Sequence, residues 1–171
     1  MLSCQNTNDK KPVSENSVEI KETTVSPNTK QAMQVDTIVI SQKHKPNFII
    51  GDFDGDKLND TVRLVQSIRN KKYGLKIIFG NNKVDYFGMG HDILKQGFDD
   101  LDWVGIFEKA PKGAVYYNNV NDAGEIITEE QVKEKDKIKL PYDAIFIHQA
   151  EACGGGIIYI KNGKFDWIQQ E

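Results

Sequence analysis

The sequence predicts a mainly β (α+β) fold: a small antiparallel sheet or β-meander with one or two short helices, preceded by a disordered N-terminal tether. Two observations predict this organisation. All 14 glycines and every Phe, Tyr and Trp of the 171-residue chain lie at Phe48 or beyond it. Over residues 47–171, short β-branched and aromatic runs alternate with turn residues, which is the pattern of an all-β domain.

Residues 1–46 are rich in Asn, Ser, Thr, Lys and Glu. Such a segment buries too little apolar surface to offset the entropy of ordering it, so a disordered tether is expected. Its apolar end, residues 35–40, can add a strand to the edge of the domain. The domain itself is expected over residues 47–171, which is long enough to form a core.

Short strands are predicted in succession along this domain, because each apolar run is bounded by turn-forming residues. The strands are expected at residues 61–68, 73–79, 83–87, 104–107, 114–117 and 144–148. The last of these should precede a C-terminal hairpin in one meander.

The hairpin has the strongest local signal, Asn162-Gly163, placed between the apolar runs 157–161 and 164–168. Asn-Gly favours a two-residue type I′ turn, because both central residues need a positive φ. The predicted register pairs Lys161 with Lys164, Ile160 with Phe165, Tyr159 with Asp166, and Ile158 with Trp167. One face of the hairpin is then apolar and faces the core.

Two short helices are also expected. Thr128 and Gln131 have the spacing of a capping box, which predicts a helix over residues 128–135. Residues 92–96, followed by Gly97, are expected to form one further helical turn.

One short acidic segment dominates the candidate chemistry. Asp52, Asp54, Asp56 and Asp60 occupy positions 1, 3, 5 and 9 of this segment, and Gly55 at position 4 lets the chain curl. Converging carboxylates repel one another unless a cation neutralises them. Oxygen ligands favour a hard cation, and Ca²⁺ accepts roughly six to eight of them in irregular geometry. A calcium loop is therefore predicted, and a solvated Asp-Gly turn is the alternative.

The segment resembles the FG-GAP or VCBS type of repeat, the calcium loop of integrin-like propellers, whose pattern D-x-[DN]-G-D-G-x-x-D precedes a strand. The resemblance implies side-chain ligands at Asp52, Asp54, Asp56 and Asp60 and a backbone carbonyl ligand at Leu58. Lys57 departs from the pattern, because the family has glycine there, and a positive φ would strain lysine. A propeller needs about four or more blades, so a single loop on a small sheet is expected here.

The N-terminal sequence Met1-Leu2-Ser3-Cys4-Gln5 is the second distinctive motif. A small residue before Cys4, followed by a polar tract, resembles the lipobox of bacterial lipoproteins. The basic and apolar parts of a signal peptide are absent before Cys4. The resemblance implies lipidation at Cys4, a membrane partner through that lipid, and a place in the bacterial cell envelope, as an outer-membrane or periplasm-facing lipoprotein.

Two other features suggest chemistry, and the charge argues against one class of partner. Cys153, followed by three glycines, could be a nucleophile with His148 as its base, or simply a small apolar residue. Asp99 or Asp100 could reach the cation as a distant ligand, or could form a solvated turn. The net charge is −3 and arginine occurs only at Arg63 and Arg69, so nucleic-acid binding is disfavoured.

Together these patterns predict a calcium-binding, lipid-anchored envelope protein that acts as a non-enzymatic binding module for a protein or glycan. Two alternatives remain open. One is an inhibitor or immunity-type protein that contacts an envelope enzyme through residues 88–97. The other is a small cysteine-dependent hydrolase that uses Cys153 and His148.

Overall fold

The computed structural model describes residues 37–121 and 123–171. Cys4 and residues 1–36 of the tether predicted over residues 1–46 lie outside the described residues. The predicted fold class is confirmed, because strands arranged in antiparallel sheets make up the regular structure and the helices are short 3-10 turns.

The first sheet is built around its longest strand, β3 (Asp60–Ser67). One edge of β3 pairs with both β1 (Ile38–Ile40) and β2 (Phe48–Gly51), and the other edge pairs with β4 (Tyr73–Ile78). β5 (Val84–Gly88) then pairs with β4. Val62 and Leu64 are fully buried on one face of β3, so the alternation of side chains turns Arg63 to the other face.

The second sheet has the order β11-β10-β9-β6, from strands β6 (Ile106–Ala110), β9 (Ala144–His148), β10 (Gly155–Lys161) and β11 (Lys164–Gln170). The predicted hairpin register of β10 and β11 is confirmed at all four pairs. Asn162 and Gly163 have φ values of 52° and 73°, as a type I′ turn requires.

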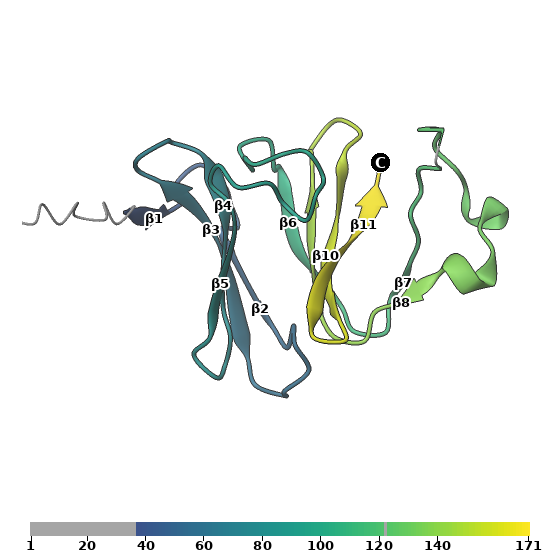
Figure 1. The fold of residues 1–171 in the computed structure, drawn as a ribbon, viewed down its shortest axis with the longest axis horizontal. Coiled ribbons are helices and arrows are strands. Elements are labelled where there is room, and N and C mark those ends of the chain that lie inside the picture. Colours follow the sequence, from purple (N-terminus) through teal and green to yellow (C-terminus); the bar gives the residue numbers. More distant parts are fainter. Residues whose placement is uncertain (1–36, 122) are drawn as a thin grey trace, which may run out of the picture. The chain divides into compact units, whose positions relative to one another are not determined.

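The main hydrophobic core lies between the two sheets, and it includes Leu75 and Ile77 from the first sheet and Ile145 and Ile158 from the second. A smaller cluster covers the opposite face of the second sheet, where the short ribbon of β7 (Val115–Tyr116) and β8 (Ile138–Lys139) contributes Tyr116 and Ile138. Strand β10 is therefore buried on both faces (Figure 1). A continuous apolar run is typical of such a strand.

The predicted helices are the main correction to the secondary structure. Residues 92–96 form turns, because Leu94 and Lys95 have positive φ values of 50° and 65° that no α-helix accommodates. In the segment 128–135 two 3-10 helices, Glu129–Gln131 and Glu134–Asp136, replace the single helix. Neither contains a buried residue, so no apolar contact with the domain stabilises a longer helix.

The fold includes residues that precede the boundary predicted at residue 47. Strand β1 lies within the apolar run 35–40 and pairs with an edge of β3, as expected. His44, which the composition assigns to the tether, is only 5% exposed. Its Nδ1 lies 2.7 Å from the Ser41 hydroxyl, and its ring packs edge-on against Tyr73.

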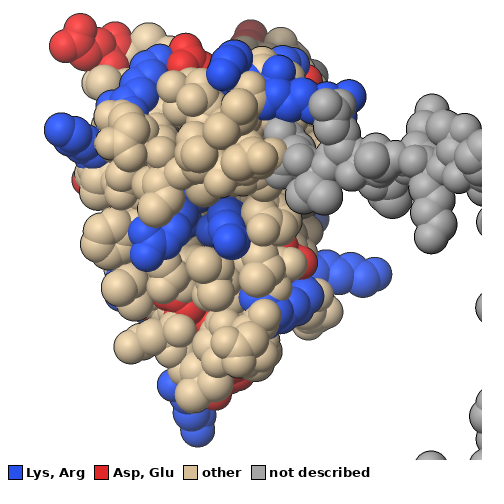
Figure 2. Space-filling model, turned by 90° about the vertical axis from the view of Figure 1, so that its left-hand side faces the viewer, with Lys and Arg blue, Asp and Glu red and all other residues tan. Residues whose placement is uncertain are grey.

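The outer face of the first sheet is open, apolar and basic. Phe48 and Tyr86 are about half exposed there and flank Arg63 and Lys76, which are direct cross-strand neighbours. Each cation lies over one of these rings, at 5.5 Å for Arg63 and Phe48 and 5.9 Å for Lys76 and Tyr86. Figure 2, viewed from the side of the first sheet, shows basic side chains within a largely uncharged surface.

Candidate metal centre

The acidic segment connects β2 to β3, and the sheet fixes both of its ends. Gly51, the last residue of β2, pairs with Asp60, the first residue of β3. Between them the chain returns on itself, and Phe53 inserts into the main core with 2% exposure. The paired ends and the buried Phe53 hold the intervening aspartates in a defined loop.

Asp60 is the buried member of this loop, with an exposed fraction of 0%. Its two carboxylate oxygens each accept one backbone hydrogen bond, from Phe53 N at 2.8 Å and from Gly80 N at 2.8 Å. Burial raises the pKa of Asp60, the two amides act in the opposite direction, and the charges of Asp54 and Asp56 raise it further. The net shift is upward, so a cation bound here would compete with a proton.

Asp52 and Asp54 shape the exposed part of the loop. Asp52 accepts hydrogen bonds from Gly55 N at 2.7 Å and Lys57 N at 3.3 Å, and Asp54 accepts one from Asp56 N at 3.1 Å. Gly55 and Lys57 have positive φ values of 87° and 70°. Lys57 therefore has the left-handed backbone conformation that favours glycine. This is the strain expected for a lysine at this position of the loop.

The loop brings three carboxylates to one centre. Asp52, Asp54 and Asp60 each offer an oxygen atom, and these atoms lie within 4.8 Å of one another. Ligand oxygens on opposite sides of a Ca²⁺ ion are roughly 5 Å apart, because each lies about 2.3–2.6 Å from the metal. The three residues can therefore hold a metal ion.

The other two predicted ligands stand apart from this group. Asp56 is exposed and is not among the clustered carboxylates. Its Oδ1 accepts a hydrogen bond from Leu58 N at 2.7 Å. The parts assigned to Asp56 and to the Leu58 carbonyl stay predictions.

The acidic loop is supported from the second sheet, which the sequence analysis missed. Asp143, just before β9, donates its backbone N–H to Asp52 O at 3.0 Å, and its Oδ2 accepts from Asp52 N at 3.2 Å. Its carboxylate also accepts Lys112 N at 3.0 Å and forms an ion pair with Lys109 at 3.2 Å. Burial acts to raise the pKa of Asp143, but these hydrogen bonds and Lys109 outweigh it, and the pKa is lowered.

We expect Asp143→Asn to lower the free energy of unfolding by roughly 1–3 kcal/mol at neutral pH in the presence of a chelator, because hydrogen bonds to an ionised acceptor are lost. The pKa of Asp143 is lowered in the folded state, so its contribution is present above the ordinary value of 3.8 and is lost as pH falls through the lowered pKa. Urea denaturation of both proteins at several pH values measures this. A stability difference that stays constant on acidification below 3.8 would contradict the assignment.

The other acidic cluster does not reach the loop. Asp100 accepts the backbone N–H of Tyr73 at 2.8 Å, and Asp99 pairs with Lys72 at 2.5 Å. Tyr73 begins β4, and the loop residue Asp60 lies beside the other end of that strand. The distant-ligand hypothesis for Asp99 and Asp100 is therefore wrong.

Within the described residues, the side chains of His148 and Cys153 make separate contacts. Nδ1 of His148 lies 2.7 Å from the carbonyl oxygen of Gln149, and Cys153 is exposed in the following loop. No hydrogen bond between the two side chains occurs in the part of the chain that the structure describes.

Comparison with known proteins adds no relative: no family model, curated protein or solved structure matches the chain. Among the described residues, no helix has the length and apolarity needed to cross a membrane.

Proposed function

We propose that this chain is a calcium-binding, lipid-anchored protein of the bacterial cell envelope and acts as a non-enzymatic binding module. The observation that carries the proposal is the convergence of Asp52, Asp54 and Asp60. A carboxylate with no exposed surface, placed beside two further acids, is unfavourable without a counter-charge. An all-oxygen set of this kind suits a hard divalent cation.

Calcium is favoured among the hard cations because the loop is irregular. Mg²⁺ needs near-octahedral geometry at about 2.0–2.1 Å, whereas Ca²⁺ accepts longer and less regular ligand sets. One oxygen from each clustered aspartate would bind the ion. Asp56 and the Leu58 carbonyl, on the basis of the family resemblance, would complete the protein part of the shell.

The role of the ion is structural in this proposal. The ion would neutralise the charge at Asp60 and hold the connection between β2 and β3 in place. Through Asp52 and its hydrogen bonds to Asp143, the same ion would stabilise the contact between the two sheets. Binding energy then adds to folding stability. The envelope assignment is supported by the resemblance of Ser3-Cys4 and the following polar tract to a lipobox.

We expect millimolar Ca²⁺ to raise the melting temperature of the purified chain relative to chelator by roughly 3–10 °C, for a site of extracellular affinity. Asp54→Ala should abolish this difference, because Asp54 is one of the three clustered ligands but makes one backbone hydrogen bond in the loop. Differential scanning calorimetry with Ca²⁺, Mg²⁺ and chelator measures the effect.

Asp102→Ala is the matched control for this experiment. Asp102 is an exposed aspartate that pairs with Lys43 and is not among the clustered acids. This variant should keep the full response to Ca²⁺. Identical melting curves of the unmodified chain with and without Ca²⁺ would disprove the proposal.

A further inference from the structure

A pocket of about 330 Å³ lies at the opposite end of the sheets from the acidic loop. Strand β9 connects the two regions, because it begins next to Asp143 beside the acidic loop and ends next to Gln149 in the pocket. The volume is at the lower end of the range for small-molecule sites, roughly 300–1,000 Å³. No residue of the acidic loop lines it.

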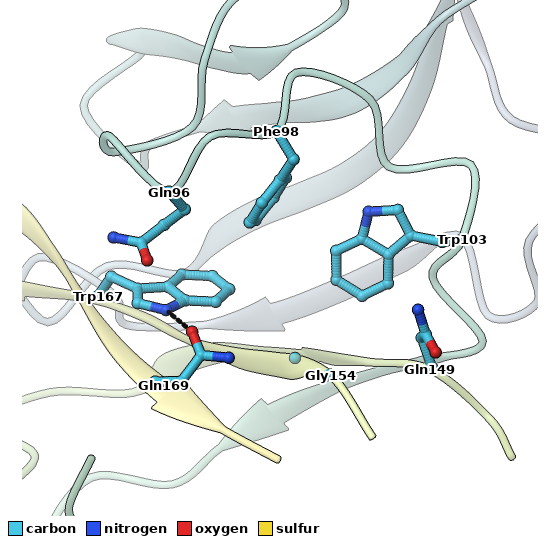
Figure 3. Close-up of a pocket in the computed structure, with 8 residues that line it drawn as sticks. Gln96, Phe98, Trp103, Gln149, Gly154, Trp167 and Gln169 are labelled. Carbon is cyan, nitrogen blue, oxygen red and sulfur yellow. Dashed lines mark hydrogen bonds between the residues drawn. The ribbon is translucent and has the colours of Figure 1, made fainter. Parts of the chain in front are cut away.

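Three aromatic side chains form its apolar walls. Phe98 packs edge-on against Trp103 and Trp167, with ring centroids 5.5 Å and 5.7 Å apart. Figure 3 shows the two indoles on opposite sides of the pocket with Phe98 between them. All three rings are only partly buried. One part of each ring packs against the main core, and the rest is open to a ligand.

The polar groups of the pocket are neutral amides. Gln149 lies on the side of Trp103, and Gln96 and Gln169 lie on the side of Trp167 (Figure 3). No Asp, Glu, Lys or Arg is among the described residues that line the pocket. A primary amide both donates and accepts hydrogen bonds, so this lining matches hydroxyl groups and offers no ion pair to a charged ligand.

Trp167 is held in a fixed position. Its Nε1 donates to Gln169 Oε1 at 2.8 Å, and Gln169 Nε2 donates to Glu171 Oε1 at 2.7 Å. The ring lies against Gly156, where an added Cβ would come within 2.1 Å of Trp167 Cζ2. A wall that is already ordered loses little entropy when a ligand binds.

Gln149 on the opposite side is available to a ligand. Within the described residues, no hydrogen bond engages its side-chain amide, although its backbone N–H donates to Gly154 O at 3.0 Å. The amide carbonyl of Gln96 is also free there, since only Nε2 is used, in a hydrogen bond to Leu94 O at 3.1 Å.

We propose that this pocket binds a neutral saccharide. A pyranose ring has an apolar C–H face that packs on an indole and hydroxyl groups around its edge that pair with amides. The two tryptophans and Phe98 supply the apolar contacts, and the unengaged amide groups of Gln149 and Gln96 supply the polar contacts, without charge. This site is separate from the acidic loop and does not depend on a bound cation.

The chain contains two tryptophans, and both line this pocket, so intrinsic fluorescence reports on it directly. The full-length protein is titrated with cellotetraose, chitotetraose and mannotetraose. At least one should give a saturable change in tryptophan emission with a dissociation constant of roughly 1 mM or lower. Calorimetry on the same pairs provides a readout that does not depend on fluorescence.

Trp103→Ala should weaken the calorimetric affinity roughly tenfold or more, and Trp103→Phe should retain part of it, because a smaller aromatic face remains. Gln149→Ala should also weaken binding while leaving both indoles in place. The unmodified protein should bind the sugar equally well with Ca²⁺ and with chelator, so that failure of the calcium proposal and failure of this one are distinguishable. Circular dichroism checks that each variant is folded.

Two results would overturn the proposal. One is the absence of saturable binding for all three oligosaccharides at about 10 mM. The other is binding whose affinity is unchanged in both Trp103→Ala and Gln149→Ala, because the sugar would then lie elsewhere on the protein.

Discussion

Replacement of Asp60 by alanine is expected to lower the free energy of unfolding by about 1–3 kcal/mol with chelator present, because the lost hydrogen bonds outweigh the relief of repulsion from Asp54 and Asp56. The substitution removes the carboxylate that accepts hydrogen bonds from the backbone amides of Phe53 and Gly80, so both amides lose their acceptor. Phe53 is buried, and a buried donor without a partner costs roughly 1–3 kcal/mol, whereas Gly80 is exposed and water can replace its lost acceptor. The connection between β2 and β3 also loses the contact that ties it to Gly80 in the turn after β4.

The comparison with Asp54→Ala separates this structural role from metal binding. Asp54 is half-buried and accepts one hydrogen bond within the loop, from Asp56 N. We expect its loss to change the metal-free stability by less than about 1 kcal/mol, while both variants lose the response to Ca²⁺. Urea denaturation in chelator measures both. Equal metal-free stability of the two variants would show that the Asp60 hydrogen bonds contribute nothing.

Gly55→Ala is expected to destabilise the protein by about 2–4 kcal/mol, for two separate reasons. The residue has a φ of 87°, which costs an L-amino acid roughly 1–2 kcal/mol. The added Cβ would also lie 2.0 Å from Cε1 of Tyr142, so the ring must move away from the loop. Such overpacking costs roughly a further 1–3 kcal/mol.

Two further variants separate the conformational cost from the steric cost. Gly97→Ala has a similar φ of 80° but meets no atom within 4 Å, so it should lose only the conformational part. In a double-mutant cycle, Tyr142→Ala should relieve the steric part of Gly55→Ala and give a favourable coupling energy. If Gly55→Ala and Gly97→Ala are equally destabilising, Tyr142 does not press on the loop.

The hairpin shows what the sequence could predict fully. Asn162-Gly163 determines the turn type, the turn determines the register, and the apolar pattern determines the buried face. All of this information lies within about a dozen neighbouring residues, so β10 and β11 match the prediction pair by pair. What the local pattern did not reveal is the ribbon of β7 and β8, which covers the other face of β10.

The helices were overpredicted because local signals do not include packing. In the capping box, the backbone N–H of Thr128 does donate to the side chain of Gln131 at 2.8 Å. A favourable N-terminal cap is not sufficient to form a longer helix when the segment buries no apolar side chain against the domain. At residues 92–96 the backbone turns instead, and the Asp92 carboxylate accepts the Gly97 N–H at 2.7 Å.

For the candidate sites too, the sequence predicts the contacts between neighbouring residues and misses those between distant ones. The spacing of Asp52, Asp54 and Asp60 is local, so three of the four proposed carboxylates could be identified as a cluster. Asp143 is 91 residues from Asp52, and no local pattern relates them. The pocket likewise combines residues from three segments of the chain, and the hairpin pattern predicts for Trp167 only a place on the core-facing side. Partial exposure, which converts a core aromatic into a ligand contact, is visible only in three dimensions.

The connection between β2 and β3 and the turn between β9 and β10 lie at opposite ends of the strands (Figure 1). The acidic loop is in the first of these and the aromatic pocket is lined in part by the second, so the domain is modular. Insertions in the 149–154 turn would change the lining of the pocket without touching the groups around Asp60. Evolution, or a protein engineer, can therefore diversify one end of this scaffold and keep the other end as an invariant base.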